Sequence, residues 1–194
     1  MLEEAVLLEL NNLSKKYNKE IWLEMGLQSS NDDTSIFINR GHNFESFADM
    51  TENIKNNYSN LIISTHIIFG LPKKIEGQKI ILETREEMLQ TVRDVSKLKI
   101  DSVKFHQLDI VLGSAFEAMY KNYDFPTLDE DFYIELMVDA ISILREDIIV
   151  SRIMGDSLGD SLIAPKWKKS KGEIINSINK LMTERELSQG CRFL

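Results

Sequence analysis

Residues 61–72 read Leu-Ile-Ile-Ser-Thr-His-Ile-Ile-Phe-Gly-Leu-Pro, and this stretch decides the fold class. The largely apolar run from Leu61 to Phe69 is typical of a strand that is buried on both faces. Gly70-Leu71-Pro72 follows directly and ends the strand, because glycine and proline interrupt regular structure. We therefore expect a buried strand here, with a turn after it.

Two helices and a second strand are predicted upstream of this strand. Apolar residues recur at three- and four-residue spacings from Leu2 to about Tyr17, and a similar amphipathic helix is expected near Phe44 to Asn57. Between them, Ile21 to Leu27 alternates in the way that indicates a strand. Ser29 to Asn43 is expected to be a polar connection.

The downstream half continues the alternation of helices and strands. Lys73 to Leu82 is expected to be irregular, Arg85 to Leu98 is predicted to be helical, and Ser102 to Val111 is strand-like. Three further elements are expected: a helix near Glu130 to Leu144, a short strand from Ile148 to Ile153, and a terminal helix near Ser170 to Arg185. This order predicts an α/β fold with a parallel sheet and right-handed crossovers, as in barrels and doubly wound folds.

Composition narrows the classes of partner. The chain has 194 residues, of which 43% are apolar, so it can bury a substantial core. A formal net charge of -8 does not support nucleic-acid binding, which depends on Lys and Arg neutralising phosphates. No apolar run is long enough to span a membrane and no secretory signal is evident, so we expect a cytoplasmic protein. The single cysteine, Cys191, excludes a disulfide within the chain and a site built from cysteines alone.

Candidate ligand-binding residues follow from the predicted sheet, because ligands of such folds lie at the carboxyl ends of the strands. Glu24 and Gln28 share one face of their strand by period two, and His66 shares a face with Gly70. Each pair is therefore expected to point toward a common pocket. The alternative for His66 is a structural histidine in the core. His42, His66 and His106 are too dispersed for a metal site to be inferred from the sequence.

Gly155-Asp156-Ser157-Leu158 spells the signature of the GDSL class of serine esterases. A nucleophilic serine needs a base to accept its proton, and those esterases carry a histidine far downstream of the signature. No histidine follows His106 in this sequence. An esterase is therefore the least favoured of three functional hypotheses.

Three motifs resemble successive strands of radical SAM proteins, in the group that contains oxygen-independent coproporphyrinogen oxidase and the elongator catalytic subunit. Residues 24–29 (Glu-Met-Gly-Leu-Gln-Ser), with Asp32 and Ile38-Asn39-Arg40-Gly41-His42, resemble the fourth-strand segment. His66 to Pro72 resembles the fifth strand, and Lys104 to Ser114 resembles the sixth strand and its loop. The tail is similar to an uncharacterised bacterial branch of the group, with Arg152, Gly155-Asp156, Ile163-Ala164-Pro165, Trp167 and a closing helix.

The resemblance implies the C-terminal half of a radical SAM (β/α)6 core, a partial TIM-type barrel over residues 1–125, with a C-terminal α/β extension over residues 126–194. In the intact family, S-adenosylmethionine (SAM) lies across the strand ends beside a 4Fe-4S cluster, and reductive cleavage of SAM yields a 5'-deoxyadenosyl radical.

Five residues are implied as SAM contacts. Gln28 and Arg40 match family positions that touch SAM, and His66 takes the place of an acid on the fifth strand. Gly70 would let the backbone approach the adenine, and Glu24 is the fifth candidate. For Arg40, the alternative is an ion pair with Asp32 or Asp33 at a helix start.

Two departures from the family shape the functional hypothesis. The Cys-x-x-x-Cys-x-x-Cys loop that holds the cluster is absent, so this chain alone cannot bind the cluster. Lys73 to Leu82 is an insertion between the Gly-Leu-Pro and Glu-Thr-Arg-Glu segments.

Our leading hypothesis is the SAM-side portion of a radical SAM enzyme, inactive alone. A non-enzymatic interaction module on the same scaffold is the alternative. The strand at Ile21 to Leu27 is expected to have an exposed edge, where the cluster-binding half or another chain would dock.

Overall fold

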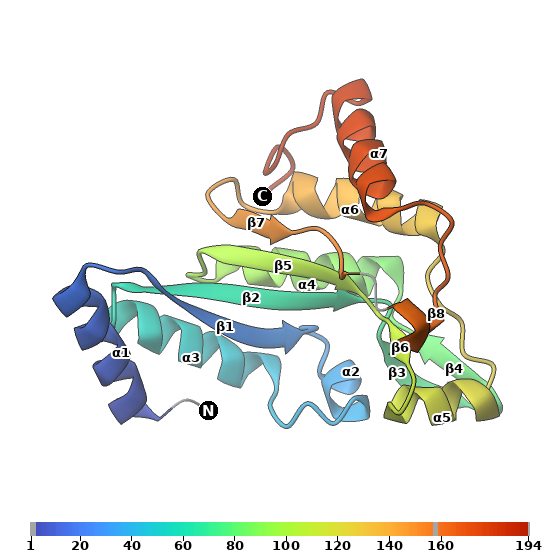
Figure 1. The fold of residues 1–194 in the computed structure, drawn as a ribbon, viewed down its shortest axis with the longest axis horizontal. Helices are drawn as coiled ribbons and strands as arrows, with labels where there is room; N and C mark the ends of the chain where they lie inside the picture. The colour runs from blue at the N-terminus through green and yellow to red at the C-terminus, as the bar shows by residue number, and fades with distance from the viewer. Residues whose placement is uncertain (1–2, 157–158, 194) are drawn as a thin grey trace.

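The computed structural model describes residues 3–156 and 159–193. Four parallel strands form the main sheet in the order β1-β2-β5-β7 (Figure 1). Their bounds are β1 Ile21–Gln28, β2 Leu61–Phe69, β5 Ser102–Gln107 and β7 Ile149–Arg152. The α/β class and the parallel sheet predicted from the alternation of elements are confirmed.

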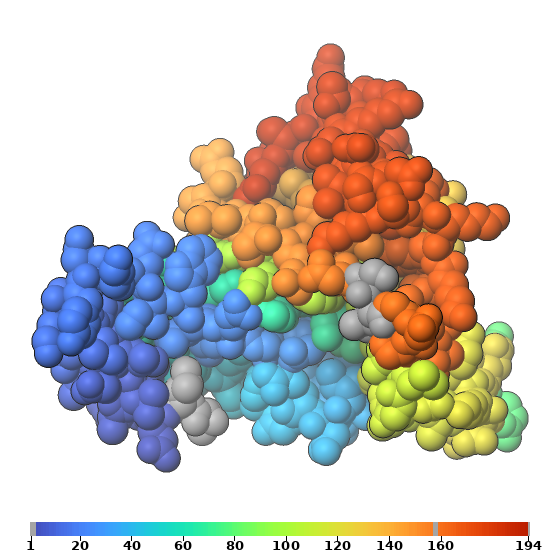
Figure 2. Space-filling model, viewed as in Figure 1, coloured from blue at the N-terminus to red at the C-terminus, as the bar shows by residue number. Residues whose placement is uncertain are grey.

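Helices cover one face of this sheet. α3 (Phe44–Asn57) and α4 (Arg85–Lys97) pack on β2, α6 (Glu130–Ile143) packs on α4, and α7 (Lys171–Glu184) packs on α6. α1 (Glu4–Tyr17) lies at the amino end of β1 and β2. Figure 1 shows the strands in front of α3 and α4, and no described helix lies over their near face. In Figure 2, teal and green atoms of β2 and β5 form the floor of a hollow on this open face.

The core lies between the sheet and its helices. Leu61, Ile63, Ile67 and Phe69 are all completely buried on the helix side of β2, and burying such a side chain contributes about 1.5–3 kcal/mol. On the opposite face of β2, the side chains of His66 and its apolar neighbours are partly exposed, which shows that this face is only partly covered. The prediction of a strand buried on both faces was therefore wrong for this face, since the described chain has a helical layer on one side only.

Three segments differ from the sequence-based expectations. Residues 73–82 are not irregular but belong to a hairpin of β3 (Pro72–Glu76) and β4 (Lys79–Leu82), whose turn contains Gly77 at φ +61°. The connection from 29 to 43 contains α2 (Asp32–Phe37), because the Asn31 side chain accepts hydrogen bonds from two backbone N–H groups and starts a helix.

The strand expected up to Val111 ends at Gln107, and the chain then leaves the main sheet. β6 (Ile110–Val111) pairs antiparallel with β8 (Leu162–Ala164), which follows the short helix η1 (Gly159–Ser161). α5 (Ala115–Asn122) lies between these pairing partners in the sequence. The β6–β8 and β5–β7 pairs connect residues on both sides of the predicted boundary at 125/126, which stays a prediction. None of the described helices is long and apolar enough to cross a membrane.

Candidate functional site

A row of polar side chains crosses the open face of the sheet. It consists of Glu24 on β1, His66 on β2, Lys104 and His106 on β5, and Arg152 on β7, and we call it the polar row. The strand register explains the alignment, because His66 lies opposite Lys104 and Lys104 lies opposite Arg152. Period-two alternation then places His106 on the same face as Lys104.

Direct contacts connect the members of the polar row. Lys104 donates a hydrogen bond to Glu24 Oε1, and His66 Nε2 lies 3.3 Å from Glu24 Oε2. The rings of His66 and His106 stack with centroids 5.5 Å apart, and Arg152 Nη1 lies 3.4 Å from His106 Nε2. The row is therefore one connected group, although its members are up to 128 positions apart in the sequence.

Burial and neighbouring cations set the charges in this row. The hydrogen bond from Lys104 lowers the pKa of Glu24, so this carboxylate stays ionised at neutral pH. Burial, followed by the nearby Arg152 charge, lowers the pKa of His106 to about 4. His106 is therefore neutral at neutral pH, and its Nε2 can accept a hydrogen bond from Arg152.

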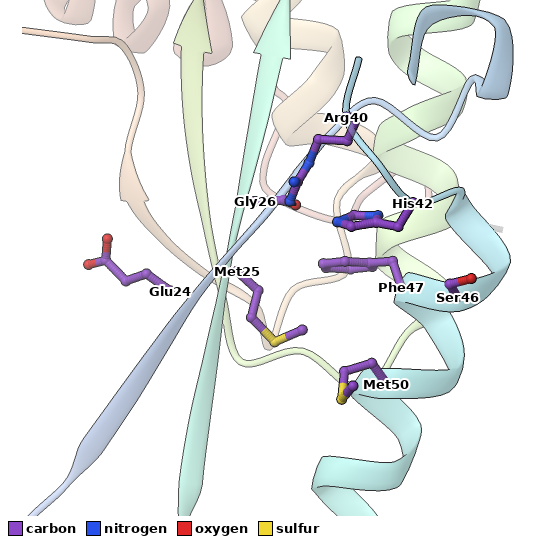
Figure 3. A pocket seen from close by; sticks show the side chains of 8 residues that line it. All are labelled: Glu24, Met25, Gly26, Arg40, His42, Ser46, Phe47 and Met50. Carbon is purple, nitrogen blue, oxygen red and sulfur yellow. The ribbon is translucent and has the colours of Figure 1, made fainter. Parts of the chain in front are cut away.

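An open pocket of about 400 Å³ lies at the free edge of β1, and we call it the edge pocket (Figure 3). The Arg40 guanidinium donates a hydrogen bond to the Gly26 carbonyl on β1. In Figure 3, His42 lies against Phe47, while Glu24 points away to the opposite side of the strand. The apolar lining consists of Met25, Phe47 and Met50.

Two polar atoms of this pocket are buried without a hydrogen-bond partner within the described chain, namely Arg40 Nε and His42 Nδ1. Burial lowers the pKa of both side chains because the charged forms are partly removed from water. Arg40 forms no ion pair with Asp32 or Asp33 in the part of the chain that the structure describes, so the structural alternative for Arg40 was wrong.

Gln28 does not line the edge pocket itself but lies next to Gly26, which does, in an unusual backbone conformation. Its φ is +67°, in the left-handed region that non-glycine residues rarely adopt. The pairing register of β1 shifts between Gly26 and Gln28, and the Gln28 amide lies over Gly26, where a side chain on Gly26 would collide with it. The amide oxygen Oε1 is buried and has no partner within residues 3–156 and 159–193.

Buried hydrogen bonds hold the backbone that follows Gln28. Ser29 Oγ donates to the Glu83 carboxylate, and Asn31 N–H donates to Ser29 Oγ over 3.0 Å. Thr91 Oγ1 accepts the N–H of residue 30 over 3.0 Å. Glu83 is 5% exposed, and burial raises its pKa. This network connects the end of β1 to the start of α4.

The structure brings four of the five predicted site residues into two adjacent groups. Glu24 and His66 belong to the polar row, whereas Gln28 and Arg40 converge on Gly26. Gly70 joins neither group: its φ is +84°, a side chain there would lie 2.9 Å from Leu128 Cγ, and its N–H donates to Met88 Sδ over 3.2 Å. Its proposed contact with adenine stays a prediction.

The sequence analysis did not select Lys104, His106, Arg152 and Glu83 as site residues. The period-two spacing of Lys104 and His106 was a usable signal for a shared face. By contrast, Arg152 and Glu83 were noted only within segments that resemble the family, because their roles depend on pairing across the fold. His66 and His106 stack on each other, but His42 lies apart in the edge pocket, and the described residues contain no group that could hold a metal ion. Ser157 and Leu158 of the esterase signature lie outside the described residues.

Residues 100–184 match the family model of the Radical_SAM C-terminal domain. This match supports a C-terminal part of a radical SAM superfamily protein. The resemblance to a C-terminal part of radical SAM proteins, noted in the sequence, is therefore confirmed. The fold of this radical SAM part is similar to that of Elp3 from the archaeon Methanocaldococcus infernus, solved with an N-terminal deletion. The TM-score is 0.74 at 23% identity, covering 93% of this chain and 39% of that one.

Two of the curated relatives of this radical SAM part, YtqA and MJ0486, are named as uncharacterised proteins. The chain is 31% identical to YtqA of Bacillus subtilis over 173 residues, which cover 89% of this chain and 50% of the relative. It is 31% identical to MJ0486 of Methanocaldococcus jannaschii over 176 residues, which cover 90% and 51%. YhcC of Escherichia coli is 28% identical over 170 residues, which cover 88% and 52%. The chain thus spans about half the length of the curated relatives it matches.

Proposed function

We propose that this radical SAM part supplies the SAM-binding side of a radical SAM site. The convergence of Gln28 and Arg40 on Gly26, beside a pocket of about 400 Å³, carries the proposal. Gln28 Oε1 and Arg40 Nε are both buried without a partner in the described chain. A buried polar group without a partner costs about 1–3 kcal/mol, so a ligand that satisfies both atoms would be stabilised there.

The chemical character of these groups suits SAM. An amide oxygen accepts a hydrogen bond from a ribose hydroxyl, and a guanidinium donates to a carboxylate. The apolar side chains of Met25, Phe47 and Met50 would shield the bound molecule from water. Glu24 and His66 would add an acceptor and a titratable group on the open face. When bound, SAM would supply the radical chemistry of the family, and this chain would hold and orient it.

The 4Fe-4S cluster does not fit this chain. Cys191 is the only cysteine, is exposed, and follows the last helix rather than a strand of the sheet. We therefore assign no reaction step to this chain alone.

Calorimetric titration with SAM tests the proposal. We expect Gln28→Ala and Arg40→Ala each to weaken binding by about tenfold or more, because each removes a buried hydrogen bond to the ligand. Arg93→Ala is the matched control, because Arg93 pairs with Glu86 on the surface of α4. Circular dichroism would verify folding. Binding that is unchanged in both site variants would refute the assignment.

The alternative proposal is a docking module. β1 ends the sheet, so one edge of its backbone is unpaired within the described chain, and such edges readily pair with another strand. The partner would be the cluster-binding part of the complete protein or a second chain. Light scattering, together with the SAM calorimetry, separates the two proposals. The module would be favoured if SAM does not bind and if the chain self-associates in a way that Met25→Arg abolishes.

A further inference from the structure

A second pocket, of about 180 Å³, lies at the carboxyl ends of β5 and β7. It shares no lining residue with the edge pocket. Its volume is below the roughly 300–1,000 Å³ typical of sites for drug-sized ligands, so it suits a small molecule. Its polar lining includes Gln107, Asp109, Lys169 and Lys171, and its apolar lining includes Trp167 and Pro165.

Gln107 fixes the carboxylate of Asp109. The Gln107 amide nitrogen donates to the two Asp109 oxygens over 3.0 and 3.1 Å, and its amide oxygen accepts the Gly155 N–H over 3.1 Å. A side chain at position 155 would come within 3.3 Å of Asp109 Oδ2 and Gln107 Nε2. The glycine therefore keeps this space open, and Gln107 leaves Asp109 little freedom to turn away.

The charge of Asp109 has no counterpart in the described chain. No Lys, Arg or His among the described residues forms an ion pair with it. The two lysines that line the same pocket are already engaged, because Lys169 pairs with Glu130 and Asp131 while Lys171 pairs with Asp156. Burial raises the pKa of Asp109, which reflects the cost of holding a negative charge there. A cation in the pocket would offset that cost.

Trp167 supplies a fixed aromatic wall. Its indole N–H donates to the Leu128 carbonyl over 2.8 Å, and its ring packs on Tyr133 with centroids 5.0 Å apart. Cations are attracted electrostatically to the face of an indole ring. A carboxylate and a held tryptophan that line the same pocket therefore suit an organic cation.

We propose that this pocket binds a small organic cation, a primary ammonium or an amidinium on a flat apolar body, between Asp109 and Trp167. The proposal does not depend on SAM binding, because the two pockets are separate.

Fluorescence titration tests this proposal with two probes of the same shape, benzamidine, which is cationic, and benzamide, which is neutral. The chain has two tryptophans, so Trp22→Phe leaves Trp167 as the only indole reporter. We expect benzamidine to change the Trp167 emission saturably, and benzamide to bind at least about tenfold more weakly, as hydrogen bonds to charged groups imply.

Asp109→Asn should weaken benzamidine binding by about tenfold or more while the side-chain volume stays the same. Asp49→Asn, at an exposed position on α3, is the matched control and should bind normally. If Asp109→Asn fails to fold, the proposal is tested by comparing the affinities of benzamidine and benzamide for the Trp22→Phe protein. Equal affinity for benzamidine and benzamide, or no binding of benzamidine, would overturn the proposal.

Discussion

The side-chain amide of Gln28 occupies the space that a side chain on Gly26 would take. The relationship depends on the left-handed backbone of Gln28, at φ +67°, and on the register shift that separates the two residues on β1. Because Arg40 donates to the carbonyl of the same glycine, Gly26 is the point on which both proposed SAM contacts converge.

Gly26→Ala therefore tests whether the position of Gln28 matters. The new methyl group would collide with the Gln28 amide, which ends a flexible side chain and can move away. We expect a stability change within about 1 kcal/mol, typical of a substitution that neighbours can accommodate, but clearly weaker SAM binding. Thermal melting and calorimetry measure the two effects. Normal SAM affinity in a folded Gly26→Ala protein would mean that Gln28 does not bind SAM from its present position.

Glu83→Ala should destabilise the fold by about 1–3 kcal/mol, because it leaves buried hydrogen-bond donors such as Ser29 Oγ without an acceptor. Glu86→Ala is the matched control three residues further along the chain, where the side chain is 72% exposed and pairs with Arg93 on the surface. Urea unfolding of both variants gives the comparison. If both variants lose the same free energy of unfolding, the network around Ser29 contributes no more to stability than a surface ion pair.

The pH dependence of stability provides a separate test of Glu83. Its pKa is raised above the ordinary value of 4.5 mainly by burial, so the folded state holds this proton more tightly than the unfolded state. Stability attributable to the group is therefore present at low pH and declines as pH rises through this window. Relative to wild type, Glu83→Gln should gain stability as pH increases from about 4.5. A difference between the two proteins that is independent of pH would contradict the raised pKa.

His106 should titrate near pH 4 in the folded protein, because burial and then the Arg152 charge oppose its protonation. Since its folded pKa lies below the unfolded value of 6.5, its contribution to stability is lost as pH falls from about 6.5 toward 4. NMR titration of the ring would measure the midpoint. Arg152→Gln should raise the midpoint part of the way, whereas Arg93→Gln should not move it. A midpoint near 6.5 in the wild type would show that the ring is hydrated.

Gly70→Ala should destabilise the fold for two reasons. The backbone has φ +84°, and the methyl group would lie 2.9 Å from Leu128 Cγ. Gly113→Ala separates the two causes, since Gly113 has φ +79° but no atom within 4 Å of the added methyl group. We expect about 1 kcal/mol for the backbone alone, and a further 1–3 kcal/mol at Gly70 from crowding. Equal losses in chemical denaturation would mean that Leu128 moves aside freely.

Much of the secondary structure followed from local patterns. The apolar run at 61–69 and the alternation at 21–27 were both found as strands, within one residue of their observed ends. The hairpin at residues 72–82 was not predicted, because its strands are short and largely exposed and show little periodicity. The helix α2 was missed because its six residues depend on the Asn31 cap rather than on an apolar face.

The sequence by itself determined the α/β class, the alternation of helices and strands that predicts a parallel sheet, and the radical SAM motifs. Each is encoded by residues close together along the chain. Only the tertiary structure decided which side chains meet. The contacts of Glu24 with His66 and Lys104 depend on the register between separate strands. The position of Gln28 depends on its own left-handed backbone, two residues before Ser30, whose N–H donates to Thr91 on a distant helix. Such relationships arise from packing between segments that are far apart in sequence, where local periodicity carries no information.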